Sequence, residues 1–295
     1  MKQIHSLLLA LSLCILLPVA SGCKGRKTDT HGRRVNVTVT IAPLEYFVKA
    51  IGGDSVSVIT LLPQGADSET FEPSVERMRA VGNADMLVSV GLLPFEQTLA
   101  ERAVAGRNDI MAVRTADGLF VHRGADADHP GNADPHIWTS IKNASAIAQN
   151  VYDALIEIEP FNKEYYDANY AAFTHRLDSL RTAWLSQLKG AQGQTFAVWH
   201  PSLGYLAQET GLRQLPLGVE HKEASALGTA QAIDKARHSH PIALIVGPEA
   251  DLDRVNTIAQ PLGLQPVVVD VMSPDWERQM QTAVDALAAG IAAKQ

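Results

Sequence analysis

Short apolar runs rich in β-branched residues alternate with helical segments along most of this 295-residue chain. In the first half, the pattern predicts strands at residues 35–40, 55–62, 85–90 and 109–113 and helices at 44–51, 74–81 and 94–105. In the second half, it predicts strands at 195–199, 214–219, 242–246 and 266–271 and helices at 202–210, 225–238, 252–262 and 274–293. Strands that are separated by helices usually pair in parallel. The sequence therefore predicts an α/β protein with two β/α lobes, each containing a mostly parallel sheet.

The stretch 141–189 interrupts this rhythm, because it contains no strand candidate. Its strongest break is Glu159-Pro160, where the proline stops one helix and fits the first turn of the next. The second helix is predicted at 161–188, and at 1.5 Å per residue it would be roughly 42 Å long. We interpret it as a rigid helix that joins the lobes; the alternative is a pair of ordinary helices broken near Thr174. The predicted domains are an N-terminal lobe (35–140), a helical linker (141–190) and a C-terminal lobe (191–295).

The first 22 residues have the features of an export signal. Lys2 precedes an apolar segment at 7–17 that is too short to span a bilayer, and small residues follow it up to Cys23. The ending Ala20-Ser21-Gly22-Cys23 is typical of bacterial lipoprotein processing, although leucine is more usual where Ala20 stands. We therefore expect a signal peptide at 1–22 and a lipid on Cys23; the alternative is ordinary cleavage near the same site. Polar residues up to 34 predict a flexible tether at 23–34.

Export would leave the protein anchored to a bacterial membrane, facing the periplasm or the cell exterior. The mature domain would then contain no disulfide and no thiolate metal ligand, because Cys14 leaves with the signal and Cys23 carries the lipid. Residues 1–22 contain one lysine and no acid, so their removal lowers the formal charge by one, from −7 to −8. A mildly acidic domain of this kind is not suited to nucleic acid.

Four side chains that can bind a metal follow strand-like runs or lie in turns: Glu69, His136, His200 and Asp270. In parallel β/α lobes, ligands bind where the loops meet at the carboxyl ends of the strands. Two of the four candidates come from each predicted lobe. Each one alone would more often be a structural or surface group, so the prediction depends on all four occurring together. The sequence therefore predicts one metal site in the cleft between the lobes.

Two neutral imidazoles and two carboxylates balance the charge of a divalent ion, which lowers the cost of burying it. They also occupy the four positions of tetrahedral zinc and leave none open for a reactive water. This ligand set favours carriage of the metal over catalysis.

Several separated motifs occur in a characteristic order: Ile41-Ala42-Pro43-Leu44, Ile51-Gly52-Gly53-Asp54, Thr70-Phe71-Glu72-Pro73, Asp134-Pro135-His136-Ile137-Trp138, Gly204-Tyr205 and Lys222-Glu223-Ala224-Ser225. With them the chain resembles the zinc and manganese solute-binding lipoproteins of ABC uptake transporters, the metal-binding cluster A-I type. The resemblance covers nearly the whole mature chain. It implies two β/α lobes bridged by a long helix, one metal ion bound between them and only small lobe movement on binding.

The resemblance places the second and third metal ligands of that family on His136 and His200, and its late carboxylate on Asp270. The first ligand departs from the pattern, because most members have Pro-His where this chain has Ser68-Glu69. Either Glu69 binds the metal directly or a water takes its place; we expect direct binding, since the rest of the loop matches.

The ligand set also bears on the choice of ion. Imidazole suits zinc and carboxylate suits manganese, but zinc generally binds such sites more strongly. We therefore predict Zn²⁺, with Mn²⁺ or Fe²⁺ as alternatives. An acidic residue usually holds a ligating imidazole in the correct tautomer, and the candidates are Asp134 and Glu249, although either also suits a surface position. The short polar loop 122–131 stands where zinc-binding members often carry a long His- and Asp-rich loop; we interpret it as solvated, the alternative being loose metal collection.

These observations predict a monomeric extracytoplasmic binding protein that delivers a divalent ion to a membrane permease driven by a cytoplasmic ATPase. The main rival is a secreted metal-dependent hydrolase, with Glu249 as general base beside a zinc-bound water. That function needs an open coordination position, and neither a His-Glu-x-x-His helix nor a nucleophile elbow supports it. We therefore expect no enzyme activity. An adhesin on the same scaffold would use surfaces that one sequence does not identify.

Overall fold

The structure is a computed structural model that describes residues 33–294 except 69, 98, 100–109, 123–132 and 218–225. The predicted signal peptide and Cys23 lie outside the described residues, as does most of the predicted tether. The chain from Arg33 to Gln295 forms one compact unit. No helix in the described ranges is both long enough and apolar enough to cross a bilayer.

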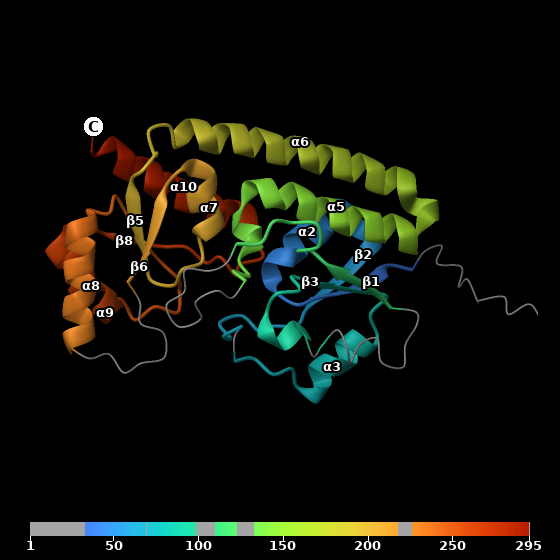
Figure 1. Ribbon diagram of the computed structural model, residues 1–295. Coiled ribbons are helices and arrows are strands. Elements are labelled where there is room, and N and C mark those ends of the chain that lie inside the picture. Colours follow the sequence, from blue (N-terminus) through green and yellow to red (C-terminus); the bar gives the residue numbers. More distant parts are fainter. Residues whose placement is uncertain are drawn as a thin grey trace, which may run out of the picture. The chain divides into compact units, whose positions relative to one another are not determined.

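The first sheet is parallel, with its strands in the order β2-β1-β3-β4 (Figure 1). The central strands β1 and β3 are almost wholly buried, because helices cover both faces of the sheet. Helices α2 and α5 lie on one side and α3 on the other (Figure 1), where the Thr38 hydroxyl donates to the carbonyl of Ala80. The elements are β1 (Val35–Val39), α2 (Ala42–Gly52), β2 (Val56–Thr60), α3 (Val75–Gly82), β3 (Met86–Ser89), β4 (Met111–Arg114) and α5 (Ile141–Ile158).

The second sheet repeats this arrangement, with all strands parallel in the order β6-β5-β7-β8. Alternate residues of β5 pack in two different hydrophobic cores. Phe196 and Val198 pack in the large core with α7 and α10, whereas Ala197 packs in a smaller cluster with α8 and α9. The elements are β5 (Thr195–Val198), α7 (Gly204–Thr210), β6 (Arg213–Pro216), α8 (Ala226–Ser239), β7 (Leu244–Val246), α9 (Leu252–Ala259), β8 (Pro266–Val268) and α10 (Trp276–Ala292).

Helix α6 (Lys163–Gln187) is a single helix of 25 residues that follows a short 3₁₀ turn opened by Pro160. The alternative of two helices broken near Thr174 is wrong. At 1.5 Å per residue, α6 is roughly 38 Å long. Its Asn169 amide donates to the carbonyl of Ile51 in α2 at 2.9 Å, and its Trp184 indole donates to Gln281 in α10 at 2.6 Å. One helix therefore contacts elements of both lobes.

The predicted two-lobe α/β architecture is confirmed, with a strand in each of the eight predicted places. Most strands are shorter than predicted, although single backbone hydrogen bonds continue past several of their carboxyl ends, such as the one from Leu62 to the carbonyl of Thr40. The predicted helix 94–105 lies partly outside the described residues, and its described start at 94–97 is helical. The limits of the domains stay predictions.

Candidate metal-binding site

Two of the four predicted ligands meet. His136 lies shortly before α5, and His200 lies two residues after the end of β5. Although they are 64 positions apart in the chain, their Nε2 atoms are 3.3 Å apart. The ring centroids are 5.1 Å apart, with the ring planes at 68°. Two nitrogens bound to one tetrahedral zinc ion at ~2.0–2.1 Å lie about 3.3 Å from each other. The pair therefore has the spacing of two ligands of one small ion.

A carboxylate fixes the orientation of the first imidazole. Asp134 Oδ1 lies 2.8 Å from His136 Nδ1 and accepts a hydrogen bond from the His136 backbone N–H at 2.9 Å. An imidazole that donates through Nδ1 presents the lone pair of Nε2, which is the atom that faces His200. A Cβ at Gly204 would lie 3.0 Å from Asp134 Oδ2, so glycine there allows α7 to approach this carboxylate.

The aromatic residue after Gly204 also holds Asp134 in place. The Tyr205 hydroxyl donates to the Asp134 carbonyl at 2.8 Å and accepts from the backbone N–H of His122 at 3.2 Å. Burial and the nearby negative charge of Asp134 raise the pKa of Tyr205 to about 12, so its hydroxyl stays protonated at neutral pH. The His122 ring lies against the Tyr205 ring, with centroids 4.6 Å apart.

The backbone around His136 is fixed by buried neighbours. Residues Ile137–Thr139 form a 3₁₀ turn, and all three are fully buried. The Thr139 hydroxyl lies 2.9 Å from the His136 carbonyl and 3.0 Å from the carbonyl of Ser202. This contact joins the segment that carries one imidazole to the segment that carries the other.

Asp270 follows β8, as predicted, but its carboxylate is used in a local turn. One oxygen accepts from the backbone N–H of Met272 at 3.0 Å. Among the described residues, no three His, Cys, Asp or Glu side chains gather as a group that could hold a metal ion. The structure thus brings His136 and His200 together, but does not bring Asp270 to them. The next residue, Val271, accepts a hydrogen bond from the Trp138 indole at 2.8 Å, so its backbone lies beside the His136 segment.

The remaining candidates are Glu69, Glu249 and the polar loop. Glu69 lies outside the described residues, as do residues 123–131 of the polar loop. Glu249 is exposed, and its carboxylate lies against its own loop, since a Cβ at Gly247 would be 2.0 Å from it. Sequence reasoning missed Thr139 and the hydrogen bond of Tyr205, although the Gly204-Tyr205 motif marked that place.

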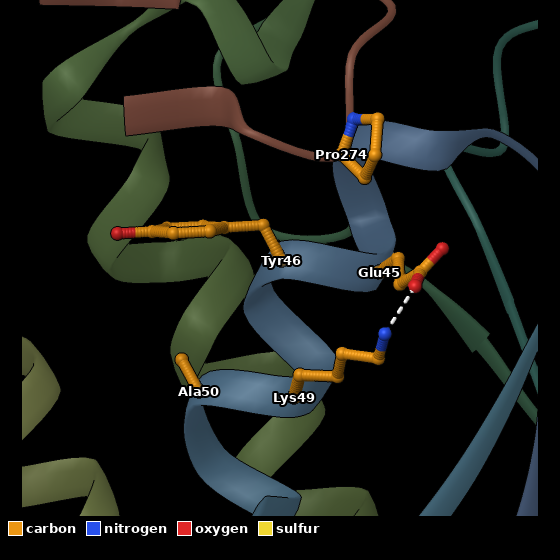
Figure 2. Close-up of a pocket in the computed structure, with 5 residues that line it drawn as sticks. All are labelled: Glu45, Tyr46, Lys49, Ala50 and Pro274. Atoms are coloured by element: carbon orange, nitrogen blue, oxygen red, sulfur yellow. Dashed lines mark hydrogen bonds and ion pairs between the residues drawn. The ribbon is translucent and has the colours of Figure 1, made fainter. Parts of the chain in front are cut away.

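A separate pocket of about 330 Å³ is lined by α2 and Pro274. Figure 2 shows the Tyr46 ring on one side of α2 and the ion pair of Glu45 with Lys49 on the other. None of its lining residues is a candidate ligand, so this pocket is distinct from the imidazole pair.

Comparisons with known proteins match nearly the whole described chain. The family model for zinc-uptake complex component A, periplasmic (ZnuA), matches residues 37–290. The high-affinity zinc uptake system protein ZnuA of Bacillus subtilis (strain 168) is 26% identical over 281 residues, which cover 90% of this chain and 88% of that protein. The manganese ABC transporter substrate-binding lipoprotein PsaA of Streptococcus pneumoniae serotype 4 is 31% identical over 188 residues, covering 61% of this chain and 59% of its own.

A solved structure agrees with these matches. A crystal structure of ZnuA has a TM-score of 0.77 and 30% identity, and the match covers 86% of this chain and 98% of that one. The resemblance drawn from the separated motifs is therefore confirmed. Because the family model matches most of its length, this chain belongs to the ZnuA family of periplasmic zinc-uptake components.

Proposed function

We propose that this protein is the extracytoplasmic substrate-binding component of an ABC uptake transporter and that it captures one divalent metal ion, Zn²⁺. The observation that carries the proposal is the 3.3 Å separation of the Nε2 atoms of His136 and His200. The relatives support this class of cargo, since one is a zinc uptake protein and another a manganese transporter component. A site of nitrogen and oxygen ligands generally binds zinc with higher affinity than manganese. We therefore propose Zn²⁺ as the cargo, with Mn²⁺ and Fe²⁺ as the alternatives.

In this proposal, Glu69 and Asp270 complete the ligand set and neutralise the ion, and Asp134 holds His136 in the tautomer that binds metal. The hydrogen bond from Trp138 to the carbonyl of Val271 supports a place for Asp270, because it holds the neighbouring backbone beside the His136 segment. One Asp270 oxygen accepts from the backbone N–H of Met272, so the ion would be bound through the other oxygen of this carboxylate.

The same proposal covers delivery. The family is one of uptake components rather than enzymes, and four protein ligands leave no position for a reactive water, so we propose carriage without catalysis. The protein would be a monomer outside the cytoplasm, anchored through a lipid on Cys23. It would present the ion to a permease driven by a cytoplasmic ATPase.

Calorimetric titration tests this function directly. A soluble form that begins after Cys23 keeps the whole compact unit, which starts at Arg33. After the bound metal is stripped with chelator, we expect one equivalent of Zn²⁺ to bind tightly and Mn²⁺ to bind more weakly. The His200→Ala form should lose more than about a hundredfold in zinc affinity, because a ligand contributes more than the 10–100-fold typical of a supporting residue.

The matched control is His175→Ala, which removes an exposed histidine of α6 and should leave zinc binding unchanged. The Glu69→Ala form separates direct binding by Glu69, which predicts a loss of affinity, from its replacement by water, which predicts none. Stoichiometric binding of neither ion, or full zinc affinity in the His200→Ala form, would contradict the proposal.

A further inference from the structure

Glu209, near the end of α7, reaches the beginning of α5. Its Oε1 accepts hydrogen bonds from the hydroxyl of Ser140, with which it makes a short contact, and from the backbone N–H of Lys142 at 3.1 Å. Ser140 is the N-cap of α5, and its own hydroxyl oxygen accepts from the backbone N–H of Asn143 at 2.8 Å. The first N–H groups of a helix have no partner within it. Glu209 and Ser140 together supply acceptors for this helix of 18 residues.

The position of Glu209 is unfavourable for α7, the helix that carries it. A negative charge in the last turn of α7 faces the negative end of that helix dipole, whereas at the start of α5 it faces the positive end. The Oε2 atom is buried and has no hydrogen-bond partner among the described residues. Burial raises the pKa of Glu209, although the bonds from Ser140 and the backbone oppose that change. The carboxylate is therefore held at some cost, and its hydrogen bonds come from the N-cap and the first turn of α5.

The two helices that Glu209 joins are those that follow the two imidazoles. Helix α5 begins at Ile141, shortly after His136, and α7 begins at Gly204, shortly after His200. The same two segments are also joined by the bond from Tyr205 to the carbonyl of Asp134. Unlike Asp134, whose carboxylate lies 2.8 Å from His136 Nδ1, Glu209 accepts its hydrogen bonds from Ser140 and Lys142 and from neither imidazole. A change at Glu209 therefore reaches the imidazoles only through the two segments.

We propose that Glu209 is a positioning residue for metal capture, which sets the separation of the His136 and His200 imidazoles by fastening the start of α5 to α7. This inference rests on the proposed function. A pair of ligands that already stands at the spacing required by the ion needs little reorganisation on binding. Loss of Glu209 should consequently weaken affinity and alter coordination geometry while leaving one ion bound.

Two substitutions test the proposal. Glu209→Ala removes both oxygens and should weaken zinc binding about tenfold, at the lower end of the effect of residues that support a ligand. Glu209→Gln keeps one acceptor for Ser140 and Lys142 and should lose less. The control is Tyr46→Phe, which removes the 2.8 Å hydrogen bond to Glu277 and so also weakens packing between the two halves of the chain. Because it touches neither imidazole segment, it should leave zinc affinity unchanged.

Two spectroscopic readouts separate positioning from a general loss of stability. With Co²⁺ as the probe ion, the visible absorption bands of Glu209→Ala should shift in position, whereas those of Tyr46→Phe should not. In the metal-free protein, the ring resonances of His136 and His200 should move in Glu209→Gln and stay in place in Tyr46→Phe.

The proposal is overturned if both Glu209 variants match the unaltered protein in zinc affinity, cobalt bands and ring resonances. If the unaltered protein binds no ion, the proposed function fails instead. The ring resonances of the metal-free variants then still decide whether Glu209 positions the two imidazoles.

Discussion

Glu96 is a buried carboxylate at the carboxyl ends of β1 and β3, the place where a parallel sheet usually binds its ligand. It is 3% exposed, and its oxygens accept five hydrogen bonds, one from the hydroxyl of Thr40 and four from the backbone N–H groups of residues 90–93. Burial raises the pKa of Glu96, while these donors lower it. Its lone pairs are committed to the loop after β3, so Glu96 shapes this edge of the sheet and does not offer a ligand.

Removal of this carboxylate should destabilise the protein strongly. Glu96→Ala leaves buried donors without an acceptor, and we expect the free energy of unfolding to fall by about 3 kcal/mol or more. Glu96→Gln keeps one acceptor oxygen and should lose less. Urea unfolding of the metal-free proteins measures the difference. Equal midpoints for Glu96→Ala and the unaltered protein would mean that the loop finds other acceptors.

The two histidines and the carboxylate of Asp134 beside His136 could be predicted from sequence, but the roles of Glu96 and Glu209 could not. His200 follows a clear strand and His136 lies in a recognisable motif. Glu96 and Glu209 look like ordinary acids of short helices, because the hydroxyls they accept from lie 56 and 69 residues away. No local sequence pattern identifies a hydrogen-bond partner that lies so far away in the chain. The place of Asp270 after a strand was also predictable, but its use in a local turn depends on its rotamer, which strand periodicity does not determine.

Among the features of the molecule, the helices and strands were predicted best, because the sequence signals that mark them are local. Apolar runs rich in β-branched residues mark the strands, and Pro160 marks the boundary between α5 and α6. The way in which these elements are fastened together was not predictable. Three helices meet at Glu277 of α10, which accepts hydrogen bonds from Tyr46 of α2 and from Arg176 of α6.

This contact should make stability depend on pH. Burial opposes ionisation of Glu277, but the bonds from Arg176 and Tyr46 outweigh it and hold the pKa of Glu277 below its usual value of 4.5. The unfolded chain therefore binds more protons than the native state between the two pKa values. The stabilisation is fully present above the unfolded pKa and is lost as the pH falls through the folded one.

We expect Glu277→Gln to lower the free energy of unfolding by about 1 kcal/mol at neutral pH. The difference from the unaltered protein should shrink as the pH falls below about 4.5, where Glu277 of the unfolded chain gains its proton, and should be lost as the pH falls through the lower pKa of the folded state. Denaturant unfolding at a series of pH values measures it, with the exposed Glu157→Gln as control. A difference that grew toward acid pH would have the wrong sign for this explanation.

At the scale of the whole molecule, one large core includes residues of both sheets. It contains Val37 of the first sheet, Phe196 of the second and Trp184 of the helix that contacts both lobes. Trp276 is 2% exposed and lies near Phe47 of α2, with ring centroids 5.3 Å apart. Its indole donates to the carbonyl of Trp138 at 2.6 Å, close to His136 in the chain. The lobes therefore share their interior, and the imidazole pair lies beside that shared packing.

A shared core predicts that the metal-free protein unfolds in one transition, with the same midpoint by far-ultraviolet circular dichroism and by fluorescence of its four tryptophans. Zinc bound only to the folded state should stabilise the whole unit, by about 2.7 kcal/mol when its free concentration is a hundred times the dissociation constant. His200→Ala should unfold near the same metal-free midpoint, because His200 is only partly buried, yet gain little from zinc. Thermal unfolding with and without Zn²⁺ measures both effects. Two separate transitions, of which zinc raises only one, would show that the lobes fold independently and that a single lobe holds the ion.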